Sequence, residues 1–309
     1  MMVVGIHTYV LSDSQITMAI RQVFNCAVPL FLVISGYFLS NKDVSNKESY
    51  NGFIRKQVPK VYIPCLLWSF PLFFLDIVNG SFEFSLILLL FVCGYSIYYF
   101  VALIIQYYLL LPILQKTNTL KSLGFMCLVS IFCILAVTYL LHFKHINIPL
   151  IAFAGPFPLW IAFFCEGIYI GKNGRDYKIW PIAVLAILSL VFAVIEARFL
   201  YSLDGGGLGV KLSSFLFSFF AVLLFFSSKT EKIFVKLGWL YRLFIWVGGL
   251  SFGIYLCHCY FVTGLSVINL PPFLNFWFVK WAIILLSSSL VVAIGKKYFP
   301  WTVKYLGFR

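Results

Sequence analysis

The sequence predicts an all-α, polytopic transmembrane helical bundle of about ten spanning helices, with both ends in the cytoplasm. Of its 309 residues, 62% are hydrophobic and 11% are charged, whereas roughly 25% of the residues in a soluble domain are charged. Apolar runs recur along the whole chain. A helix that crosses the hydrocarbon core needs about 20 such residues, because its backbone polar groups must pair internally. The runs do not alternate between polar and apolar residues, as the strands of a membrane barrel would.

Ten apolar runs are long enough to be spanning helices. Residues 82–93 form a shorter apolar run, which we expect to be interfacial or re-entrant. No connection is long enough for a separate soluble domain, so we expect a single integral membrane domain over 1–309. The predicted spans are 1–12, 22–40, 57–78, 96–115, 123–142, 151–171, 178–200, 210–228, 246–268 and 276–296.

The net charge of +13 is explained by topology and does not indicate nucleic-acid binding. Eighteen of the 23 Lys and Arg fall in alternate connections, including the C-terminal tail, and the positive-inside rule puts that side and both termini in the cytoplasm. The eight cysteines are scattered singly without the spacing of metal ligands, so we predict buried small hydrophobes and no metal site.

Three ionisable residues lie within the predicted spans, where such groups are costly and often functional. These are His7, Glu166 and His258. The two histidines fall at similar depths in the middle to outer part of the membrane, so they could share one cavity. A neutral imidazole can take a proton from a hydroxyl, which makes a general base plausible.

A purely structural role is the alternative for each of these residues. Each histidine could only hydrogen-bond across helices, and a bis-histidine haem site is a further rival. Glu166 could serve helix packing or an interhelical hydrogen bond. In the second span, Ser35 precedes Gly36, which permits close approach of another helix, while contact of Ser35 with a ligand is the alternative.

A basic segment joins the second and third predicted spans and ends with Arg55 and Lys56 just before the third span. Topology alone accounts for its charge. A nucleotide-bearing ligand in the cytosol would also need a cationic entry, and arginine can bind phosphate through two hydrogen bonds.

The first predicted span begins at the first residue and holds a histidine at position 7. It lacks the basic start and the cleavage site of a signal peptide. We therefore expect it to be the outer half of a spanning helix whose cytoplasmic half lies upstream of Met1.

Taken together, several stretches resemble the acyltransferase-3 family of membrane O-acyltransferases, especially the short bacterial ten-helix members. The resemblance covers nearly the whole chain. Its carriers are VVGIH (3–7), VPLFLVISGYFL (28–39), FIRKQVPKVYIP (53–64), YYFVALIIQYYLLLPIL (98–114), FFCEGIYIG (163–171) and LSFGIYLCH (250–258).

The resemblance assigns roles to individual residues. The family's first helix carries a basic residue and then a catalytic histidine. His7 matches the histidine, while the basic residue would lie upstream of Met1. The last motif keeps Ser251, Tyr255 and His258. Before the fourth span the family often has a His-Leu-Trp-Phe-like run. In this chain residues 97–100 align with that run. They contain no histidine, but Tyr99 keeps an aromatic ring that also carries a polar hydroxyl.

The resemblance implies transfer of an acyl group, usually acetyl, from cytosolic acyl-CoA to a hydroxyl of a cell-envelope carbohydrate or its lipid-linked precursor. His7 would be the general base, Arg55 and Lys56 would bind the CoA phosphates, and His258 and Tyr255 would orient the acceptor or polarise the carbonyl. The implied location is the bacterial cytoplasmic membrane. The alternative is a glycan or lipid transporter or flippase, which would usually show two related halves. The sequence does not indicate an oligomeric state.

Overall fold

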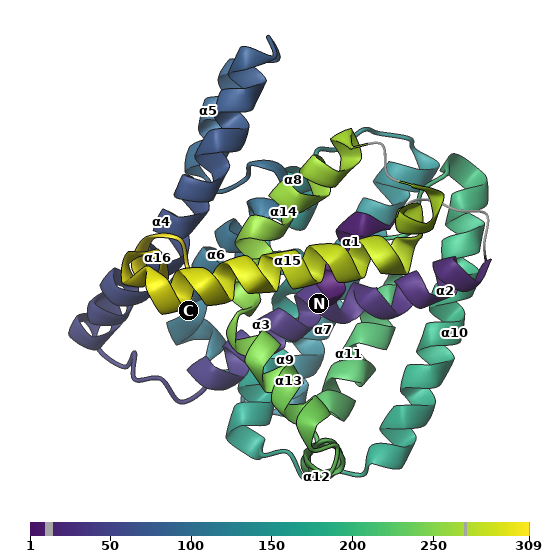
Figure 1. Cartoon of the computed structure of the whole chain (residues 1–309). Coiled ribbons are helices and arrows are strands. Elements are labelled where there is room, and N and C mark those ends of the chain that lie inside the picture. Colours follow the sequence, from purple (N-terminus) through teal and green to yellow (C-terminus); the bar gives the residue numbers. More distant parts are fainter. Residues whose placement is uncertain (10–14, 269–270, 309) are drawn as a thin grey trace. The chain divides into compact units, whose positions relative to one another are not determined.

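The computed structural model describes residues 1–9, 15–268 and 271–308, and within these ranges every regular element is a helix. The predicted all-helical class is therefore confirmed. The chain folds into two compact units: the first contains residues 1–10, 51–108 and 239–309, and the second contains residues 11–50 and 109–238. Each unit is assembled from separate stretches of chain (Figure 1). The single domain over 1–309 stays a prediction.

Helices from the start, the middle and the end of the chain form the first unit. The helix α4 begins in the second unit and α6 ends there. The helices are α1 (Met2–Thr8), α4 (Lys47–Val78), α5 (Phe84–Phe91), α6 (Tyr99–Leu114), α13 (Trp239–Gly249), α14 (Ser251–Val267), α15 (Trp277–Tyr298) and α16 (Pro300–Tyr305).

The second unit contains the remaining helices. They are α2 (Gln15–Val23), α3 (Ala27–Leu39), α7 (Leu120–Thr138), α8 (Leu150–Ala154), α9 (Ile161–Asn173), α10 (Ile179–Asp204), α11 (Leu212–Phe226) and α12 (Ser228–Val235).

Within the described ranges, six helices are long and apolar enough to cross a membrane, or up to eight if each of two bent helix pairs is one span. The pairs are α11 with α12, bent by 64°, and α13 with α14, bent by 75°. Two predicted spans are shorter in the structure. In the predicted span 1–12, α1 has seven residues, and residues 10–12 lie outside the described ranges. The predicted span 151–171 is broken into α8, a 3-10 turn and α9.

Two local expectations are settled by the helix bounds. The helix α5 has eight residues, too few to cross a bilayer, as expected for the segment 82–93. The basic segment before the third span is not a loop throughout, because α4 already begins at Lys47. Arg55 and Lys56 therefore lie on a helix.

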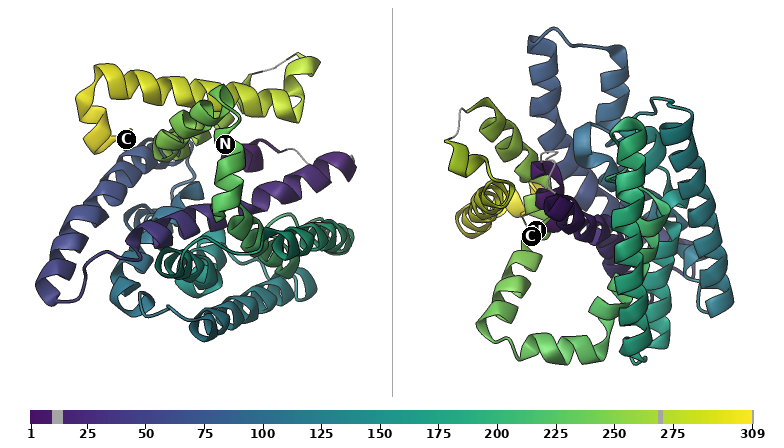
Figure 2. Two further views of the ribbon diagram at one scale, coloured as in Figure 1. Left: turned by 90° about the horizontal axis from the view of Figure 1, so that it is seen from below. Right: turned by 90° about the vertical axis from the view of Figure 1, so that its right-hand side faces the viewer.

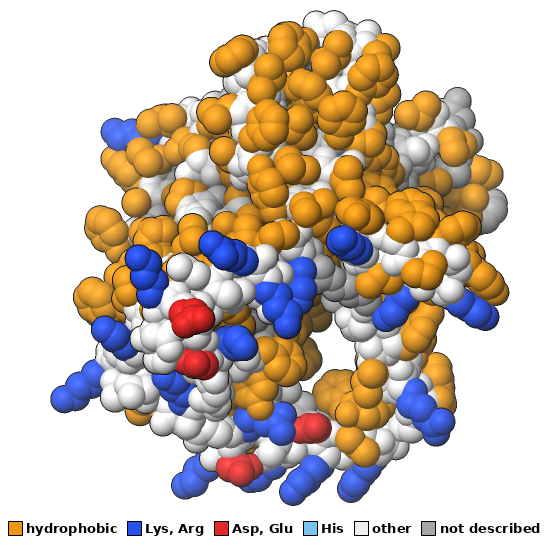
Figure 3. All heavy atoms as spheres, turned by 90° about the vertical axis from the view of Figure 1, so that its left-hand side faces the viewer, with side chains coloured by type: hydrophobic (Ala, Val, Ile, Leu, Met, Phe, Trp, Pro, Cys, Tyr) orange, Lys and Arg blue, Asp and Glu red, His pale blue; other side chains and the backbone are white. Residues whose placement is uncertain are grey.

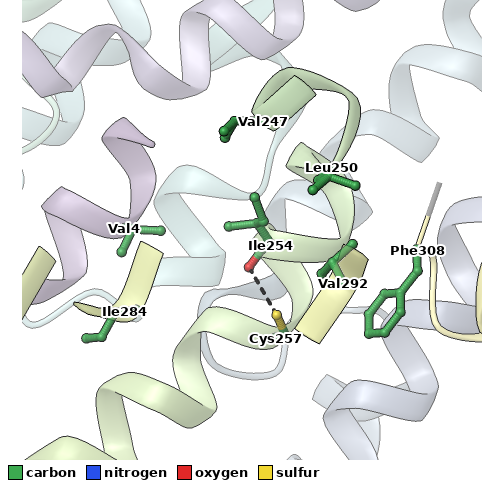
Figure 4. Packing of buried hydrophobic residues seen from close by; sticks show 8 residues of the cluster. All are labelled: Val4, Val247, Leu250, Ile254, Cys257, Ile284, Val292 and Phe308. Carbon is green, nitrogen blue, oxygen red and sulfur yellow. Dashed lines mark hydrogen bonds between the residues drawn. The ribbon is translucent and has the colours of Figure 1, made fainter. Parts of the chain in front are cut away.

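The core of the first unit joins α1 to the C-terminal helices. Eight buried apolar side chains pack together there (Figure 4): Val4, Val247, Leu250, Ile254, Cys257, Ile284, Val292 and Phe308. Because Val4 comes from α1 and the others come from α13 to α15 and the C-terminal tail, this cluster fixes the short first helix against partners distant in sequence.

Two tryptophans of α15 also hold α1, which lies beside α15 in Figure 1. The indole Nε1 of Trp277 donates to the carbonyl of Gly5 at 3.0 Å, and that of Trp281 donates to the carbonyl of Met1 at 2.9 Å. Backbone carbonyls need internal partners in an apolar environment, so these bonds position α1 as well as stabilise it.

In the second unit, α3 and α9 pack with their backbones in close contact. A Cβ added at Gly36 would lie 2.1 Å from the carbonyl oxygen of Phe164, and one at Gly167 would lie 2.1 Å from that of Val33. The close approach at Gly36 was expected from the sequence. Gly167 and Gly171 are four residues apart, the small-residue spacing typical of membrane helix pairs.

The helices α10 and α11 run side by side in the second unit (Figure 2). The carboxylate of Glu196 on α10 accepts from the backbone N–H of Ser213, in the first turn of α11, at 2.9 Å. A helix start leaves N–H groups without intrahelical partners, so this contact both pairs the two helices and satisfies one such donor.

Large apolar side chains cover much of the surface, as Figure 3 shows for one face. On α4 and α5, Phe70, Phe74, Phe84 and Leu88 are each more than half exposed. Extensive apolar surface of this kind is costly in water but suits contact with lipid.

We predict that Gly167→Ala destabilises the protein, because the new methyl group would meet the backbone of α3, which cannot move as a flexible side chain can. Overpacking typically costs about 1–3 kcal/mol. The measurement is the apparent melting temperature of the purified protein in detergent.

The matched control is Gly124→Ala on α7, where an added Cβ meets nothing within 4 Å. We expect this change to be neutral or slightly stabilising, since alanine favours helix more than glycine does. Equal melting temperatures for the two variants would contradict the backbone contact between α3 and α9.

Candidate functional site

A histidine pair lies in the first unit, where α1 meets α14. The ring centroids of His7 and His258 are 5.4 Å apart, and the ring planes are inclined by 44°. His258 is fully buried and His7 is half-buried. The structure thus brings together two ionisable residues that are 251 positions apart in the sequence, and the packing of α1 on α14 and α15 is what holds them in place.

Two backbone carbonyls of α14 determine which ring nitrogen of His258 carries the hydrogen. Its Nδ1 lies 2.7 Å from the carbonyl oxygen of Tyr255 and 3.1 Å from that of Ile254. A carbonyl can only accept, so Nδ1 carries the hydrogen, and in the neutral ring Nε2 then presents a lone pair. Among the described residues, Nε2 is buried without a hydrogen-bond partner. It is a proton acceptor beside the ring of His7.

Tyr255 lies next to this pair but its hydroxyl points elsewhere. The ring centroids of Tyr255 and His258 are 6.2 Å apart, while the hydroxyl donates to the carbonyl of Ile97 at 2.8 Å. In the opposite direction, the hydroxyl of Tyr98 donates to the carbonyl of Leu256 at 2.6 Å. These reciprocal bonds fasten α14 to the start of α6.

The remaining predicted residues of the first unit differ in their burial. Ser251 is the first residue of α14 and Tyr99 the first of α6, and both are half-buried. Arg55 and Lys56 lie on the first half of α4, and both are exposed at the surface. A site for a ligand that enters from water requires cations in such a position.

Ser35 and Glu166 belong to the second unit. The hydroxyl of Ser35 donates to the carbonyl of Phe31 within α3 at 2.9 Å. Glu166 is fully buried on α9, and neither carboxyl oxygen has a hydrogen-bond partner among the described residues. The interhelical hydrogen bond considered for Glu166 is therefore not formed there.

A buried polar network in the second unit, which we call the Lys211 cluster, was not predicted from the sequence. Arg21 and Lys211 look like ordinary charges at span ends. The sequence signal that could have revealed them is that each cation is followed within four positions by two further polar residues, in RQVFN (21–25) and in KLSS (211–214). The cluster consists of Arg21, Gln22 and Asn25 with Lys211, Ser213 and Ser214, and Glu196 adjoins it.

Within the described part of the chain, no group of three or more His, Cys, Asp or Glu side chains is suited to hold a metal ion. The absence of a metal site stays a prediction for the protein as a whole.

Comparison with known families gives a match over nearly the full length. Residues 1–295 match the acyltransferase-3 family, whose model is described as an acyltransferase domain. The chain belongs to this family. Membership and the apolar helices together indicate a multi-pass membrane protein that contains an acyltransferase-3 domain.

A curated relative of this acyltransferase-3 protein is the serine/alanine racemase of Enterococcus gallinarum. The two are 27% identical over 298 residues, which cover 85% of this chain and 39% of the racemase. The chain thus spans well under half the length of that relative. No solved structure matches the chain.

We predict that Tyr255→Phe lowers stability by about 1 kcal/mol, the typical net value of one hydrogen bond, because the carbonyl of Ile97 loses its donor. Tyr98→Phe is the matched variant, since it removes the reciprocal bond to Leu256. Melting temperatures of both variants give the measurement. An unchanged value for Tyr255→Phe would show that its hydroxyl does not hold the start of α6.

Proposed function

We propose that this acyltransferase-3 protein moves an acyl group, most simply acetyl, from cytosolic acetyl-CoA to a hydroxyl of a cell-envelope carbohydrate or its lipid-linked precursor. The single observation that carries the proposal is the His7–His258 pair, in which the lone pair of His258 Nε2 is buried beside the ring of His7. Acyl transfer to a hydroxyl requires a base that removes the hydroxyl proton, and a positioned imidazole is the commonest such group.

In the proposed reaction, His7 takes the proton from the acceptor hydroxyl as its oxygen attacks the thioester carbonyl. The new C–O bond forms, the C–S bond breaks, and the thiolate of CoA receives the proton back from His7. The protein's contribution is to hold the base and the two substrates in the geometry of attack, which replaces an improbable encounter by a prearranged one.

His258 is proposed to act through His7. The family resemblance implies that it orients the acceptor or polarises the carbonyl, but polarising a carbonyl needs a donor, and a neutral Nε2 with its hydrogen on Nδ1 is an acceptor. Accepting the N–H of His7 would orient that ring and direct the lone pair of its other nitrogen to the hydroxyl. This is the arrangement of a base with an orienting partner.

Arg55 and Lys56 are proposed to bind the phosphates of CoA. Both are cations on the first half of α4 in the first unit, the unit that contains the histidine pair. Arginine binds phosphate with two parallel hydrogen bonds and lysine acts as a point charge.

The proposed topology has ten crossings and cytoplasmic termini, in the cytoplasmic membrane of a bacterium. The crossings are the six long helices, the two bent pairs, the broken segment from α8 to α9, and the predicted first span at 1–12, of which α1 is the described helical part. It places Arg55 and Lys56 on the side where acyl-CoA is present, and the whole of residues 1–309 then forms one membrane domain.

Transport of a glycan or lipid remains the alternative function. The histidine pair favours transfer because it supplies the proton acceptor that acyl transfer to a hydroxyl needs. The racemase activity named for the relative belongs to a protein of which this chain matches 39%, and we do not extend it to this chain.

We predict that His7→Ala reduces acetyl transfer by a factor of about 10² or more, the usual contribution of a general base, while the protein still folds. The measurement is transfer of radiolabel from acetyl-CoA to envelope glycans in membranes that contain equal amounts of each variant.

The control for this prediction is His145→Asn. His145 is exposed and has a φ of 52°, a backbone conformation that asparagine tolerates. We expect normal transfer by this variant. Undiminished transfer by His7→Ala would rule out the proposed base, and glycan movement without any acyl transfer would favour the transporter.

We predict that Arg55→Ala and Lys56→Ala each raise the KM for acetyl-CoA several-fold at low salt and change kcat little, since they would contact a part of the donor remote from the reacting carbonyl. High salt should shrink the difference because exposed charges are screened. The control is Lys47→Ala, an exposed cation nearer the start of the same helix. A KM that responds equally to all three changes would indicate a general charge effect rather than a phosphate site.

A further inference from the structure

The connection between the predicted spans 210–228 and 246–268 is helical rather than an extended loop. It contains α12, a turn at 236–238 and most of α13. The helix α12 bends from α11 by 64° in the second unit (Figure 1), and α13 bends from α14 by 75° in the first unit. Spanning helices tilt by only about 20° from the bilayer normal on average. A helix that turns this far from an adjoining span therefore runs mostly along the membrane surface.

Three lysines form one face of α12. Lys229 and Lys232 are three residues apart, and Lys236, which follows α12 with helical backbone angles (φ −67°, ψ −17°), is four residues further on. This spacing brings the three side chains to the same side of the helix. All three are exposed, and in the described part of the chain no carboxylate lies within ion-pair distance of them. The lysine face therefore carries positive charge without a counter-ion from those residues.

The acid of this connection already has a partner. Glu231 is the single Asp or Glu in the sequence of residues 229–245, and its carboxylate lies 2.9 Å from the guanidinium of Arg175, in the connection before α10. The hydroxyl of Ser228 donates to the carboxylate of Asp176 in that same connection. These contacts hold the start of α12 in the second unit and leave the lysine face turned to its surroundings.

Exposed apolar side chains accompany the cations. On α12, where no side chain is buried, Ile233 is 58% exposed. On α13, Trp239, Leu243 and Trp246 have the spacing of one helical face, and Trp239 is 73% exposed. Arg242, also exposed, falls on that face between the two tryptophans. Apolar surface of this kind is costly in water, whereas tryptophans and long cations together are typical of the headgroup region of a membrane.

We propose that α12 and α13 are interfacial helices that bind the anionic headgroups of phospholipids. An anionic lipid surface supplies both partners that the connection lacks: phosphates for the lysine face and for Arg242, and the boundary of the acyl chains for the apolar side chains. A soluble polyanion would satisfy the cations but would leave Ile233 and Trp239 in water. A purely apolar partner would cover those two side chains but would not compensate the charge.

The proposed topology is consistent with this location. It places residues 229–245 on the cytoplasmic side, between one span that ends there and another that begins there, so both helices start at the depth of the headgroups. The inference concerns binding to the lipid surface and does not depend on the acyl-transfer reaction.

The test compares nanodiscs of phosphatidylcholine alone with nanodiscs that also contain phosphatidylglycerol. For each protein we would measure the melting temperature and the phosphatidylglycerol that stays bound after transfer to detergent. The lysine variant combines Lys229→Gln, Lys232→Gln and Lys236→Gln. The matched control removes the same charge from three other exposed lysines of the second unit, also by glutamine; these are Lys42, Lys47 and Lys121.

We expect phosphatidylglycerol to stabilise the wild type and the control, and to bind the lysine variant several-fold more weakly at low salt. High salt should shrink the difference, because exposed charges are screened. The lysine variant should fold, since its three side chains are exposed and glutamine is about as good a helix former as lysine.

Three results would overturn the proposal. The first is that phosphatidylglycerol does not stabilise the wild type, and the second is that the lysine variant responds to it as the control does. The third is a change in the oligomeric state of the lysine variant that is equal in both kinds of nanodisc, which would make a second copy of the chain the partner of the lysine face.

A second measurement tests the contact of α13 with lipid. Brominated phosphatidylcholine quenches the fluorescence of tryptophans that reach the acyl chains. We expect Trp239→Phe to lower the quenchable emission, and we expect Trp160→Phe, which removes a buried tryptophan, to leave it unchanged. Equal losses from the two variants would show that α13 does not lie against lipid and would overturn its interfacial placement.

Discussion

Backbone polar groups within a lipid bilayer must find hydrogen-bond partners inside the protein, and the first unit depends on this constraint. In the first unit, the indoles of Trp277 and Trp281 satisfy carbonyls of α1, and the hydroxyl of Tyr255 satisfies that of Ile97. The same constraint fixes the hydrogen of His258 on Nδ1, since the carbonyl of Tyr255 accepts it. The chemistry proposed for the histidine pair is thus a consequence of how the backbone is satisfied.

Apolar run length was sufficient to predict the fold class and most of the long helices, because the hydrocarbon core imposes one length on every span. It failed where a helix departs from a straight crossing. The bend of 75° between α13 and α14 and the break before α9 leave composition almost unchanged. The extension of α4 to Lys47 was also missed, because a polar helix outside the membrane carries no apolar signal.

The histidine pair could be found from the sequence because ionisable residues in apolar spans are few. The contact between the two histidines could not be predicted, since it requires α1 to pack on α14, a helix near the other end of the sequence. The Lys211 cluster escaped prediction for a different reason. A lysine at a span end ordinarily reaches water, and only the packing of α2 against the start of α11 shows that Lys211 is buried with Gln22.

The central claim is that His7 and His258 act as one unit in acyl transfer, and a double-mutant cycle tests it most directly. Initial rates of acetyl transfer from acetyl-CoA would be measured for wild type, His7→Ala, His258→Ala and the double variant at equal protein levels. Residues that act as a unit are strongly non-additive, so we expect the double variant to be about as slow as His7→Ala. Losses that multiply, or full activity in His258→Ala, would contradict the claim.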